Sequence, residues 1–355
     1  MIAPGSTIGI LGGGQLGRML AMAAARLGYR CHVYSPEKDS VAAEVSARFT
    51  CGDWHDRTQL AEFALGCEVV TYEFENVPVA PLAAIPAERL VPGVRALEVA
   101  QDRLREKRFL EELGGRPAPY IAIDADHELA AAIDRTGTPG ILKTRRDGYD
   151  GKGQWRVASA HEVAGLRVPN AGLIYEGLVR FEAEFSVILV RGRDGEIRFW
   201  DSTQNVHEGG ILARASLPPA GIVTAHVAQA RELARKAAEA LGYVGVLTLE
   251  FFATSPNGPF EGPVFNEMAP RVHNSGHWTI EGAVTCQFEN HVRAICGLPL
   301  GDTATRARSV EMRNLVGADA ARAVELLGDP TLHLHLYGKA EAREGRKMGH
   351  VTKLT

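Results

Sequence analysis

Residues 141–155 combine lysine, arginine and glycine in a pattern that suits a phosphate ligand. An apolar strand end delivers Lys143, and two arginines, three glycines and a second lysine follow directly after it. Glycine lets backbone N–H groups turn toward a ligand, and cations beside such a loop match a polyphosphate. The segment lacks the Gly-Lys-Ser/Thr ending of a P-loop, so it is a different kind of loop. The alternative is a solvated hairpin tip that binds nothing.

Two glutamates, Glu250 and Glu267, are predicted to face each other across a hairpin. The apolar strands 244–253 and 263–268 flank a turn centred near Gly258, and antiparallel pairing about that centre sets the two carboxylates opposite one another. Like charges opposed on one face destabilise a sheet, and a divalent cation between them removes the conflict. Oxygen ligands, with Asn266 beside them, favour Mg²⁺ over zinc. The alternative is that one glutamate pairs with an arginine.

The loop 268–278, directly after the second glutamate, carries Arg271, His273, Asn274, Ser275 and His277. The two histidines stand four residues apart, but the loop has no helical periodicity and no obvious third ligand. We therefore expect contacts to anions and substrate here, in preference to a zinc site. Further cations follow in the segment 339–347, for which a solvated charged tail is the ordinary explanation.

The glycine-rich segment 12–17 follows a short apolar strand and opens a helix, which matches Gly-x-Gly-x-x-Gly. A dinucleotide site is a weak interpretation, because the next strand ends in Ser35-Pro36 with no acid at its tip to hold a ribose. We expect one phosphate to bind the N–H groups of Gly14 to Leu16 at the start of the helix. A tight turn without any ligand is the alternative.

A further acidic cluster closes the strand predicted at 69–74. Side chains at the carboxyl end of a parallel strand face the crevice where ligands bind, so Glu73 and Asn76 are candidates for substrate contacts. The alternative is a capped strand end with solvated acids.

The elements that must position these residues fall into three groups. Strands and helices alternate over 7–75, which predicts a parallel sheet covered by helices. A small α+β module follows, and antiparallel hairpins dominate from residue 184 onward. The expected helices are 16–27, 104–113, one after Asp124, one near 160–166, 223–241 and 282–296, and the expected strands are 7–11, 31–34, 69–74, 120–123, 141–143, 155–157, 173–176, 185–190, 197–204, 244–253 and 263–268.

Composition narrows the class of protein. The chain has 355 residues, 45% of them hydrophobic and 23% charged, with a net charge of −4. These values are ordinary for a globular protein of two or three domains, and they argue against a general binder of nucleic acid or of anionic membranes. Five widely spaced cysteines suggest reduced thiols, and no apolar run approaches the length of a membrane span. We therefore expect a soluble cytoplasmic protein.

With these segments in hand, the chain resembles the ATP-grasp ligases and, more narrowly, the N5-carboxyaminoimidazole ribonucleotide synthetases of purine biosynthesis. The resemblance runs through nearly the whole length, in residues 12–19, 72–76, 143–146, 148–154, 241–246, 266–278 and 345–350. It implies a Rossmann-like pre-ATP-grasp domain over 1–105, a small ATP-grasp lid domain over 106–183, and a large ATP-grasp domain with a C-terminal tail over 184–355.

The resemblance also assigns residues to roles. The residues implied for ATP are Arg103, Lys143, Gly148, Tyr149, Asp150, Gly151, Lys152, Gly153, Gln154, Glu176, Gly177, Leu178, Val179, Glu184, His207, Asn266 and Glu267. Within that set, the strand with Glu176 and Val179 would contact adenine and Glu184 would hold the ribose. Those implied for aminoimidazole ribonucleotide and bicarbonate are Gln15, Leu16, Glu73, Tyr149, Asp150, Lys152, Arg271, His273, Asn274, Lys339, Arg346 and Lys347. Mg²⁺ would bind Glu250 and Glu267, and the implied catalytic residues are Lys143, Asp150, Arg271 and His273.

The implied reaction is the ATP- and bicarbonate-dependent carboxylation of the exocyclic amine of 5-aminoimidazole ribonucleotide, through carboxyphosphate, by a homodimer. Residues 148–154 would double as a lid, and Asp150 would orient the amine or take its proton. Two other activities are set against this expectation. One is another ATP-grasp ligase, such as formate-dependent glycinamide ribonucleotide transformylase, and the other is a nicotinamide-dependent oxidoreductase that uses residues 12–17.

Overall fold

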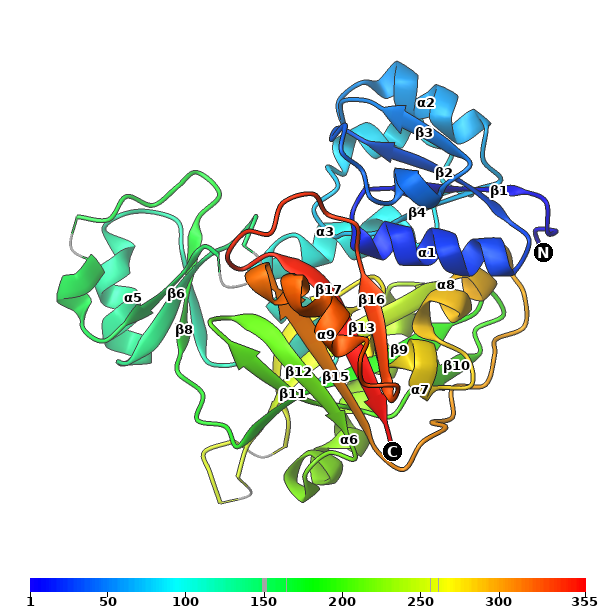
Figure 1. The fold of residues 1–355 in the computed structure, drawn as a ribbon. Coiled ribbons are helices and arrows are strands. Elements are labelled where there is room, and N and C mark those ends of the chain that lie inside the picture. The colour runs from blue at the N-terminus through cyan, green and yellow to red at the C-terminus, as the bar shows by residue number, and fades with distance from the viewer. Residues whose placement is uncertain (149–151, 164, 256, 261) are drawn as a thin grey trace.

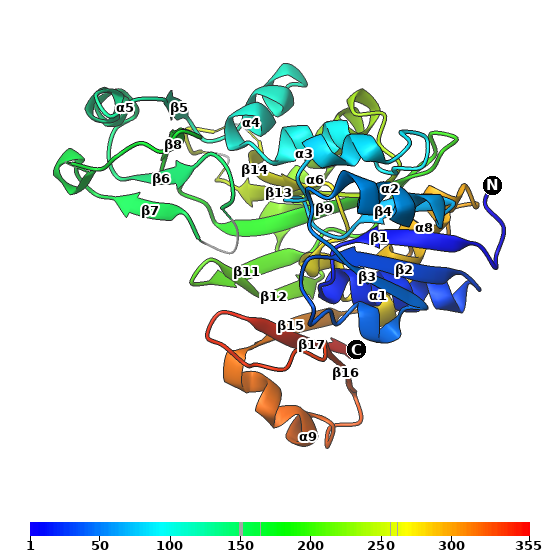
Figure 2. The same cartoon turned by 90° about the horizontal axis from the view of Figure 1, so that it is seen from above.

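The computed structural model describes residues 1–148, 152–163, 165–255, 257–260 and 262–355. These residues form three sheets, and Figure 1 shows them as an N-terminal unit at the upper right, a small unit at the left and a large central sheet. Seen from above in Figure 2, the small unit projects from one end of the molecule, while the C-terminal strands continue the large sheet. Each unit contains an apolar cluster of buried side chains, and a further cluster joins the N-terminal unit to the large sheet.

The N-terminal unit is the predicted parallel sheet, with strand order β3-β2-β1-β4. Helix α1 buries Leu16, Leu20, Ala23 and Ala24 on one face, as the apolar spacing of the sequence predicts. The elements of this unit and of the connection that follows are β1 (Thr7–Leu11), α1 (Gln15–Arg26), β2 (Arg30–Ser35), η1 (Ala43–Val45), β3 (Arg48–Cys51), α2 (Arg57–Leu65), β4 (Val69–Tyr72), η2 (Ala80–Ala84), α3 (Val94–Ala100) and α4 (Arg103–Glu112).

The small unit is an antiparallel sheet of order β5-β8-β6-β7 with helix α5 on one face. Leu129 and Ile133 of α5 pack on Ile123, Leu142 and other side chains of that face, which leaves the opposite face for polar residues. Its elements are β5 (Tyr120–Ile123), α5 (Glu128–Thr136), β6 (Gly140–Thr144), β7 (Gln154–Val157), η3 (Ala160–Val163) and β8 (Leu173–Gly177).

The large sheet has the order β14-β13-β9-β11-β12-β15-β17-β16, with β10 paired to β9. Its elements are β9 (Ala183–Arg191), β10 (Ile197–Phe199), β11 (Gln204–Glu208), β12 (Ile211–Leu217), α6 (Gly221–Ala240), β13 (Gly245–Ala253), β14 (Val264–Ala269), η4 (Asn274–Gly276), α7 (Thr279–Gly282), α8 (Gln287–Cys296), β15 (Val310–Val316), η5 (Gly317–Arg322), α9 (Ala323–Leu326), β16 (Leu332–Leu336) and β17 (Lys347–Leu354).

Strands β9 and β13 are covered on both faces, and this decides which of their residues are available to a ligand. Val187 and Leu249 point into the cluster under α6, whereas Ile188 and Val246 point into the cluster that includes α8 and α1. Because side chains alternate along a strand, Ser186 and Glu250 share the second face. The carboxylate of Glu250 is therefore placed on the side away from α6.

Several predicted elements are wrong in extent. The strand predicted at 197–204 is two strands, because the chain leaves β9 between β10 and β11 to bury Trp200, whose indole N–H donates to Thr285 O. The helix predicted at 282–296 begins at Gln287, after an extended segment follows α7. The helix predicted near 160–166 is the short 3₁₀ turn η3.

The C-terminal tail is the largest difference from the sequence expectation. Residues 310–354 contribute β15, β16 and β17 to the large sheet, with β15 paired to β17 and β17 to β16. Alternation of apolar and charged residues along β15, whose pattern is Val-Glu-Met-Arg-Asn, is the signal that this region is a strand. In the described part of the chain, no helix combines the length and the apolar character needed to cross a bilayer.

Candidate active site

The predicted pairing of the two glutamates is confirmed. In the hairpin of β13 and β14, Glu250 is the direct partner of Glu267, and the register shifts immediately afterwards so that Phe251 pairs with Phe265. Asn266 is consequently the extra residue of a β-bulge, next to the carboxylate pair. Directly opposed side chains of an antiparallel pair lie on the same face, so the two carboxylates share one site.

The electrostatics of this pair favour a bound cation. Burial raises the pKa of Glu250 to about 7, and the charge of Glu267 adds to the rise. Ser186 Oγ donates to Glu250 Oε1 at 3.0 Å, while the guanidinium of Arg103 lies 3.6 Å from Glu267 Oε2. The alternative in which a glutamate pairs with an arginine is thus also present, but the arginine contacts Glu267 and not Glu250. Two carboxylates with a bulged amide beside them are oxygen ligands that fit Mg²⁺.

Lys143 lies on the polar face of the small unit in a buried charge cluster. Its Nζ is 2.9 Å from Glu176 Oε2, and the other carboxylate oxygen, Oε1, is 3.2 Å from Nζ of Lys107. Burial alone raises the pKa of Glu176, but the two ammonium groups outweigh it and hold that pKa at about 2. Burial lowers the pKa of Lys143, against the opposing charge of Glu176. The structure therefore brings two of the predicted nucleotide residues into direct contact.

Helix α4 supplies residues that the sequence analysis missed. Besides Arg103, it buries Glu106 and Lys107, which are 2% and 1% exposed. Glu106 Oε1 accepts the backbone N–H of Met268 at 2.6 Å, and burial raises the pKa of Glu106 to about 8. Charged residues on a helix ordinarily face water, so the sequence gives no signal that these two point inward. The helix runs through the predicted domain boundary at residues 105 and 106.

The glycine loop joins β6 to β7 in the small unit. Arg103 Nη2 donates to Gly148 O at 3.4 Å, and Thr144 N donates to Gly153 O at 2.8 Å. Arg103 consequently contacts both the loop and Glu267, one of the two opposed glutamates. Lys152 and Gln154 lie at the end of the loop that enters β7. The predicted residues Tyr149, Asp150 and Gly151 lie outside the described residues.

Two further predicted nucleotide residues form an ion pair at the start of the large sheet. His207 Nδ1 contacts Glu184 Oε2, from adjacent strands β11 and β9. Burial lowers the pKa of His207, but the bond with Glu184 and the charge of Glu250 outweigh burial and raise the pKa overall. This pair can accept hydrogen bonds from hydroxyl groups through the carboxylate and donate hydrogen bonds to them through the imidazole.

The segment 177–179 connects the small unit to the large one. Gly177 N donates to Pro119 O at 2.8 Å, and Leu178 N donates to Pro139 O at 3.3 Å. Val179 packs with Ala118 and other side chains of a small apolar cluster. The side chain of Val179 is therefore buried within the protein.

The prediction that the N–H group of Gly14 binds a phosphate at the start of α1 is wrong. Glu73, 7% exposed, accepts the N–H of Gly14 at 2.7 Å through Oε1 and that of Gly17 at 2.9 Å through Oε2. Burial raises the pKa of Glu73, and the two N–H groups oppose this. A carboxylate thus takes the place expected for an anion at this helix terminus, next to Gln15 and Leu16.

Arg271 meets Glu75, a residue that the sequence analysis did not select. Its Nε and Nη2 both donate to the Glu75 carboxylate, the Nη2 bond being 2.9 Å long. Burial lowers the pKa of Arg271, but the charge of Glu75 outweighs burial and raises that pKa overall. In the same way, burial raises the pKa of Glu75, and the charge of Arg271 outweighs it and lowers that pKa. The pattern Glu-Phe-Glu at 73–75 carried the signal, because both acids follow the same strand end.

His273, in the loop 268–278, lies close to the carboxylate of Glu250. Its Nδ1 is 2.8 Å from Ser275 Oγ and 3.9 Å from Glu250 Oε1. Burial lowers the pKa of His273 well below its ordinary value, with the Arg271 charge adding to the effect, so the imidazole is neutral at neutral pH. Asn274 instead bonds Asn314 at 2.9 Å, on the buried side of the loop. His277, which was not among the individually predicted site residues, is fully buried.

The C-terminal cations reach the same region from the other side. Lys339 lowers the pKa of Glu73 and Lys347 that of Glu75, in each case against a larger effect of burial, which places both ammonium groups near these acids. Lys339 Nζ donates to Lys347 O at 2.8 Å. Arg346 differs, because its guanidinium donates to Glu341 O at 3.0 Å in the C-terminal loop.

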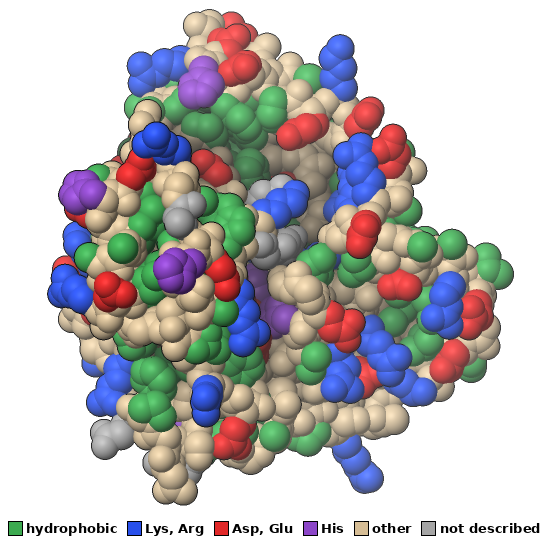
Figure 3. All heavy atoms as spheres, turned by 90° about the vertical axis from the view of Figure 1, so that its left-hand side faces the viewer, with side chains coloured by type: hydrophobic (Ala, Val, Ile, Leu, Met, Phe, Trp, Pro, Cys, Tyr) green, Lys and Arg blue, Asp and Glu red, His purple; other side chains and the backbone are tan. Residues whose placement is uncertain are grey.

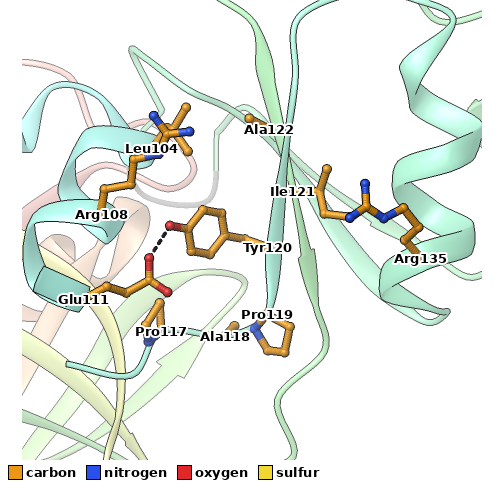
Figure 4. A pocket seen from close by; sticks show the side chains of 10 residues that line it. All are labelled: Leu104, Arg108, Glu111, Pro117, Ala118, Pro119, Tyr120, Ile121, Ala122 and Arg135. Atoms are coloured by element: carbon orange, nitrogen blue, oxygen red, sulfur yellow. Dashed lines mark hydrogen bonds between the residues drawn. The ribbon is translucent and has the colours of Figure 1, made fainter. Parts of the chain in front are cut away.

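Figure 3 shows a hollow in the face formed by the small unit and the large sheet, with Lys or Arg and His side chains in its walls. A separate cavity of about 560 Å³ lies between α4, β5 and α5 (Figure 4). Its polar lining includes Arg108 and Glu111 of α4, Tyr120 of β5 and Arg135 of α5. The Tyr120 hydroxyl donates to Glu111, and none of the ten lining residues is among those predicted for the site.

Three family descriptions match the chain. The ATP-grasp domain matches residues 108–288, the ribonucleotide synthetase preATP-grasp domain matches 5–101, and the phosphoribosylaminoimidazole carboxylase C-terminal domain matches 311–355. The first covers the small unit and much of the large sheet, the second the parallel sheet, and the third strands β15 to β17. The predicted fold class is thereby confirmed.

Known proteins are similar to this chain over nearly its whole length. The N5-carboxyaminoimidazole ribonucleotide synthase of Brucella melitensis is 48% identical, over 99% of this chain and 97% of its own. An ADP complex of an N5-carboxyaminoimidazole ribonucleotide synthetase superposes with a TM-score of 0.92 at 38% identity, covering 100% of this chain and 94% of that one. The Aspergillus clavatus enzyme in complex with ADP and 5-aminoimidazole ribonucleotide gives 0.88 at 30% identity, covering 99% and 94%. The chain belongs to the N5-carboxyaminoimidazole ribonucleotide synthase family of ATP-grasp ligases.

Proposed function

We propose that the protein carboxylates the exocyclic amine of 5-aminoimidazole ribonucleotide, using ATP and bicarbonate and forming ADP and phosphate. The observation that carries this proposal is the opposed pair Glu250 and Glu267 beside Arg103, which also contacts the glycine loop. Relatives that bear the synthase name, and a relative bound to ADP and the ribonucleotide, support the choice of substrates.

The nucleotide would bind between the polar face of the small unit and the carboxylate pair. Glu176 and the backbone of 177–179 would meet the base, while Glu184 and His207 would bond the ribose hydroxyls. Lys143 and the loop 148–154 would surround the phosphates. Mg²⁺, held by Glu250 and Glu267, would neutralise charge on the phosphates when bound.

In the first step a bicarbonate oxygen attacks the γ-phosphorus, the bond to the ADP oxygen breaks, and carboxyphosphate forms. Lys143 would hold the negative charge that moves onto the phosphate oxygens, since it is a buried cation near Arg103. Arg271 and neutral His273 would flank the bicarbonate, from the loop that follows the metal strand. Closure of the small unit over this site would exclude water, which otherwise hydrolyses carboxyphosphate.

In the second step the exocyclic amine attacks the carboxyl carbon, phosphate leaves with the C–O bonding electrons, and the amine loses a proton. Glu73, Glu75 and Arg271 lie beside one another with Lys339 and Lys347 near them, a mixed set suited to hydroxyls and a phosphate monoester. We propose that the ribonucleotide binds there and that Asp150 takes the proton.

The test is phosphate release with each substrate omitted in turn. Release at full rate is expected only with ATP, bicarbonate and the ribonucleotide together. Replacement of bicarbonate and the ribonucleotide by formate and glycinamide ribonucleotide separates the transformylase activity. Unchanged release without the ribonucleotide would contradict the proposal, and saturable binding of NADH would favour an oxidoreductase.

We also propose that the enzyme is a cytoplasmic homodimer, built from the domains 1–105, 106–183 and 184–355 set out above. The parallel N-terminal sheet and the C-terminal strands β15 to β17 are the surfaces that the family resemblance indicates. Light scattering at two protein concentrations checks the mass, which is expected to be twice the 38.3 kDa of one chain.

A further inference from the structure

Lys107 is a buried cation to which the reaction outlined above gives no task. It lies on α4, is 1% exposed, and places Nζ 3.2 Å from Glu176 Oε1. Its Nζ also lies 5.9 Å from the centre of the Tyr120 ring, whose face can stabilise an ammonium group. A lysine held this far from water requires a permanent negative partner, and Glu176 is that partner.

The carboxylate of Glu176 is shared by two cations on different elements. Lys143 of β6 donates a hydrogen bond to Oε2 at 2.9 Å, and Lys107 of α4 forms an ion pair with Oε1 at 3.2 Å. The two lysines differ in what else they can reach. Lys143 leads from its strand directly into the glycine loop, whereas Lys107 is enclosed by α4 and Tyr120.

A polyphosphate in the proposed site would compete with Glu176 for Lys143. When Lys143 turns to the phosphate, it leaves one oxygen of a buried carboxylate without its cation, and a buried carboxylate with no counter-ion is strongly destabilising. Lys107 removes this cost, because it remains on Glu176 after Lys143 has left. Because two lysines contact one carboxylate, Lys143 can move from Glu176 to a phosphate while Lys107 stays in place.

We propose that Lys107 is a positioning residue: a standing counter-ion for Glu176 that frees Lys143 to bind the nucleotide phosphates. The inference rests on the proposed nucleotide site. Lys107 itself touches no substrate in this scheme. Its effect is confined to ligands that recruit Lys143, which are those with phosphate groups.

The experiment compares ATP with adenosine as ligands of the full-length protein, by calorimetry. Lys107→Met removes the charge and keeps most of the side-chain volume. We expect ATP to bind at least about tenfold more weakly, because Lys143 then stays on Glu176. Adenosine carries no phosphate and should bind within about threefold of the wild-type affinity. Lys107→Arg retains the charge and should recover most of the ATP affinity, and Lys236→Met, at an exposed position on α6, is the matched control.

A second comparison keeps the test valid if Lys107→Met does not fold. Glu176→Gln removes the charge that needs a counter-ion, so adding Lys107→Met to it should cause no further loss of ATP affinity. A further loss in the double variant would overturn the inference, as would equal weakening of ATP and adenosine by Lys107→Met, or no weakening of either. Failure of the wild-type protein to bind ATP would instead refute the proposed function.

Discussion

The opposed carboxylates predict that one substitution stabilises the protein while it removes activity. Glu250→Gln keeps the shape of the side chain and removes its charge. Burial and Glu267 raise the pKa of Glu250 from 4.5 to about 7. A carboxyl group with a raised pKa binds protons more tightly in the folded state, so stability from this group falls as the pH rises from 4.5 to 7.

The size of the effect follows from that shift. A difference of about 2.5 pKa units at about 1.36 kcal/mol each amounts to about 3 kcal/mol, which the ionised glutamate costs above pH 7 in the absence of metal. Glutamine does not pay this cost, and its amide can still accept the bond from Ser186. In EDTA at pH 8 we therefore expect Glu250→Gln to raise the free energy of unfolding by up to about 3 kcal/mol.

Urea unfolding in EDTA at pH 5 and pH 8 measures this, together with phosphate release in Mg²⁺. The gain should be small at pH 5 and large at pH 8, while turnover is lost. Glu208→Gln, at an exposed end of β11, is the control and should change stability by less than about 0.5 kcal/mol. A variant that is no more stable than the wild type at pH 8 would refute the reasoning from opposed charge.

Three other substitutions and one titration test the remaining roles. Glu267→Ala should abolish turnover through loss of Mg²⁺ binding, and near-normal activity would contradict the proposed metal site. Asp150→Ala should leave ATP affinity intact and reduce carboxylation sharply; a collapse of ATP affinity would make it a nucleotide ligand. Arg271→Lys loses the two-bond contact to Glu75 and should raise KM for the ribonucleotide roughly tenfold, with KM for ATP unchanged. Burial lowers the pKa of His291 from 6.5 to about 4, so its contribution of about 3 kcal/mol should be present above pH 6.5 and disappear as the pH falls through 4, as measured by urea unfolding.

The part of the site that the sequence predicted best depends on local geometry. The pairing of Glu250 with Glu267 followed from the approximate centre of one turn. The bulge at Asn266 lies between that turn and the pair, and its extra residue brings Glu267, and not Asn266, opposite Glu250. The helix face of α1 followed in the same way from apolar spacing.

The part that escaped prediction depends on how distant segments dock. The bonds from Gly14 to Glu73 and from Glu106 to the strand of Glu267 join residues 59 and 162 positions apart. In a predicted helix, a charged residue such as Lys107 is expected to face solvent. Its buried partner, Glu176, belongs to the small unit and reaches it only in the folded structure. The strands of the C-terminal segment were missed although β15 carries the alternation typical of a strand, because the cations of 339–347 suggested a solvated tail.

The turn before α1 makes the residues allowed at Gly12 and Gly14 depend on the residue at position 73. A methyl group on Gly14 would stand 2.6 Å from Glu73 Oε1, and one on Gly12, whose φ is +112°, would stand 2.4 Å from Glu73 Cγ. Substitution of either glycine would expel the acid, and loss of the acid would leave two amides that could attract a stray anion. Descendants of this chain should therefore retain both glycines and the acid, or replace all three together.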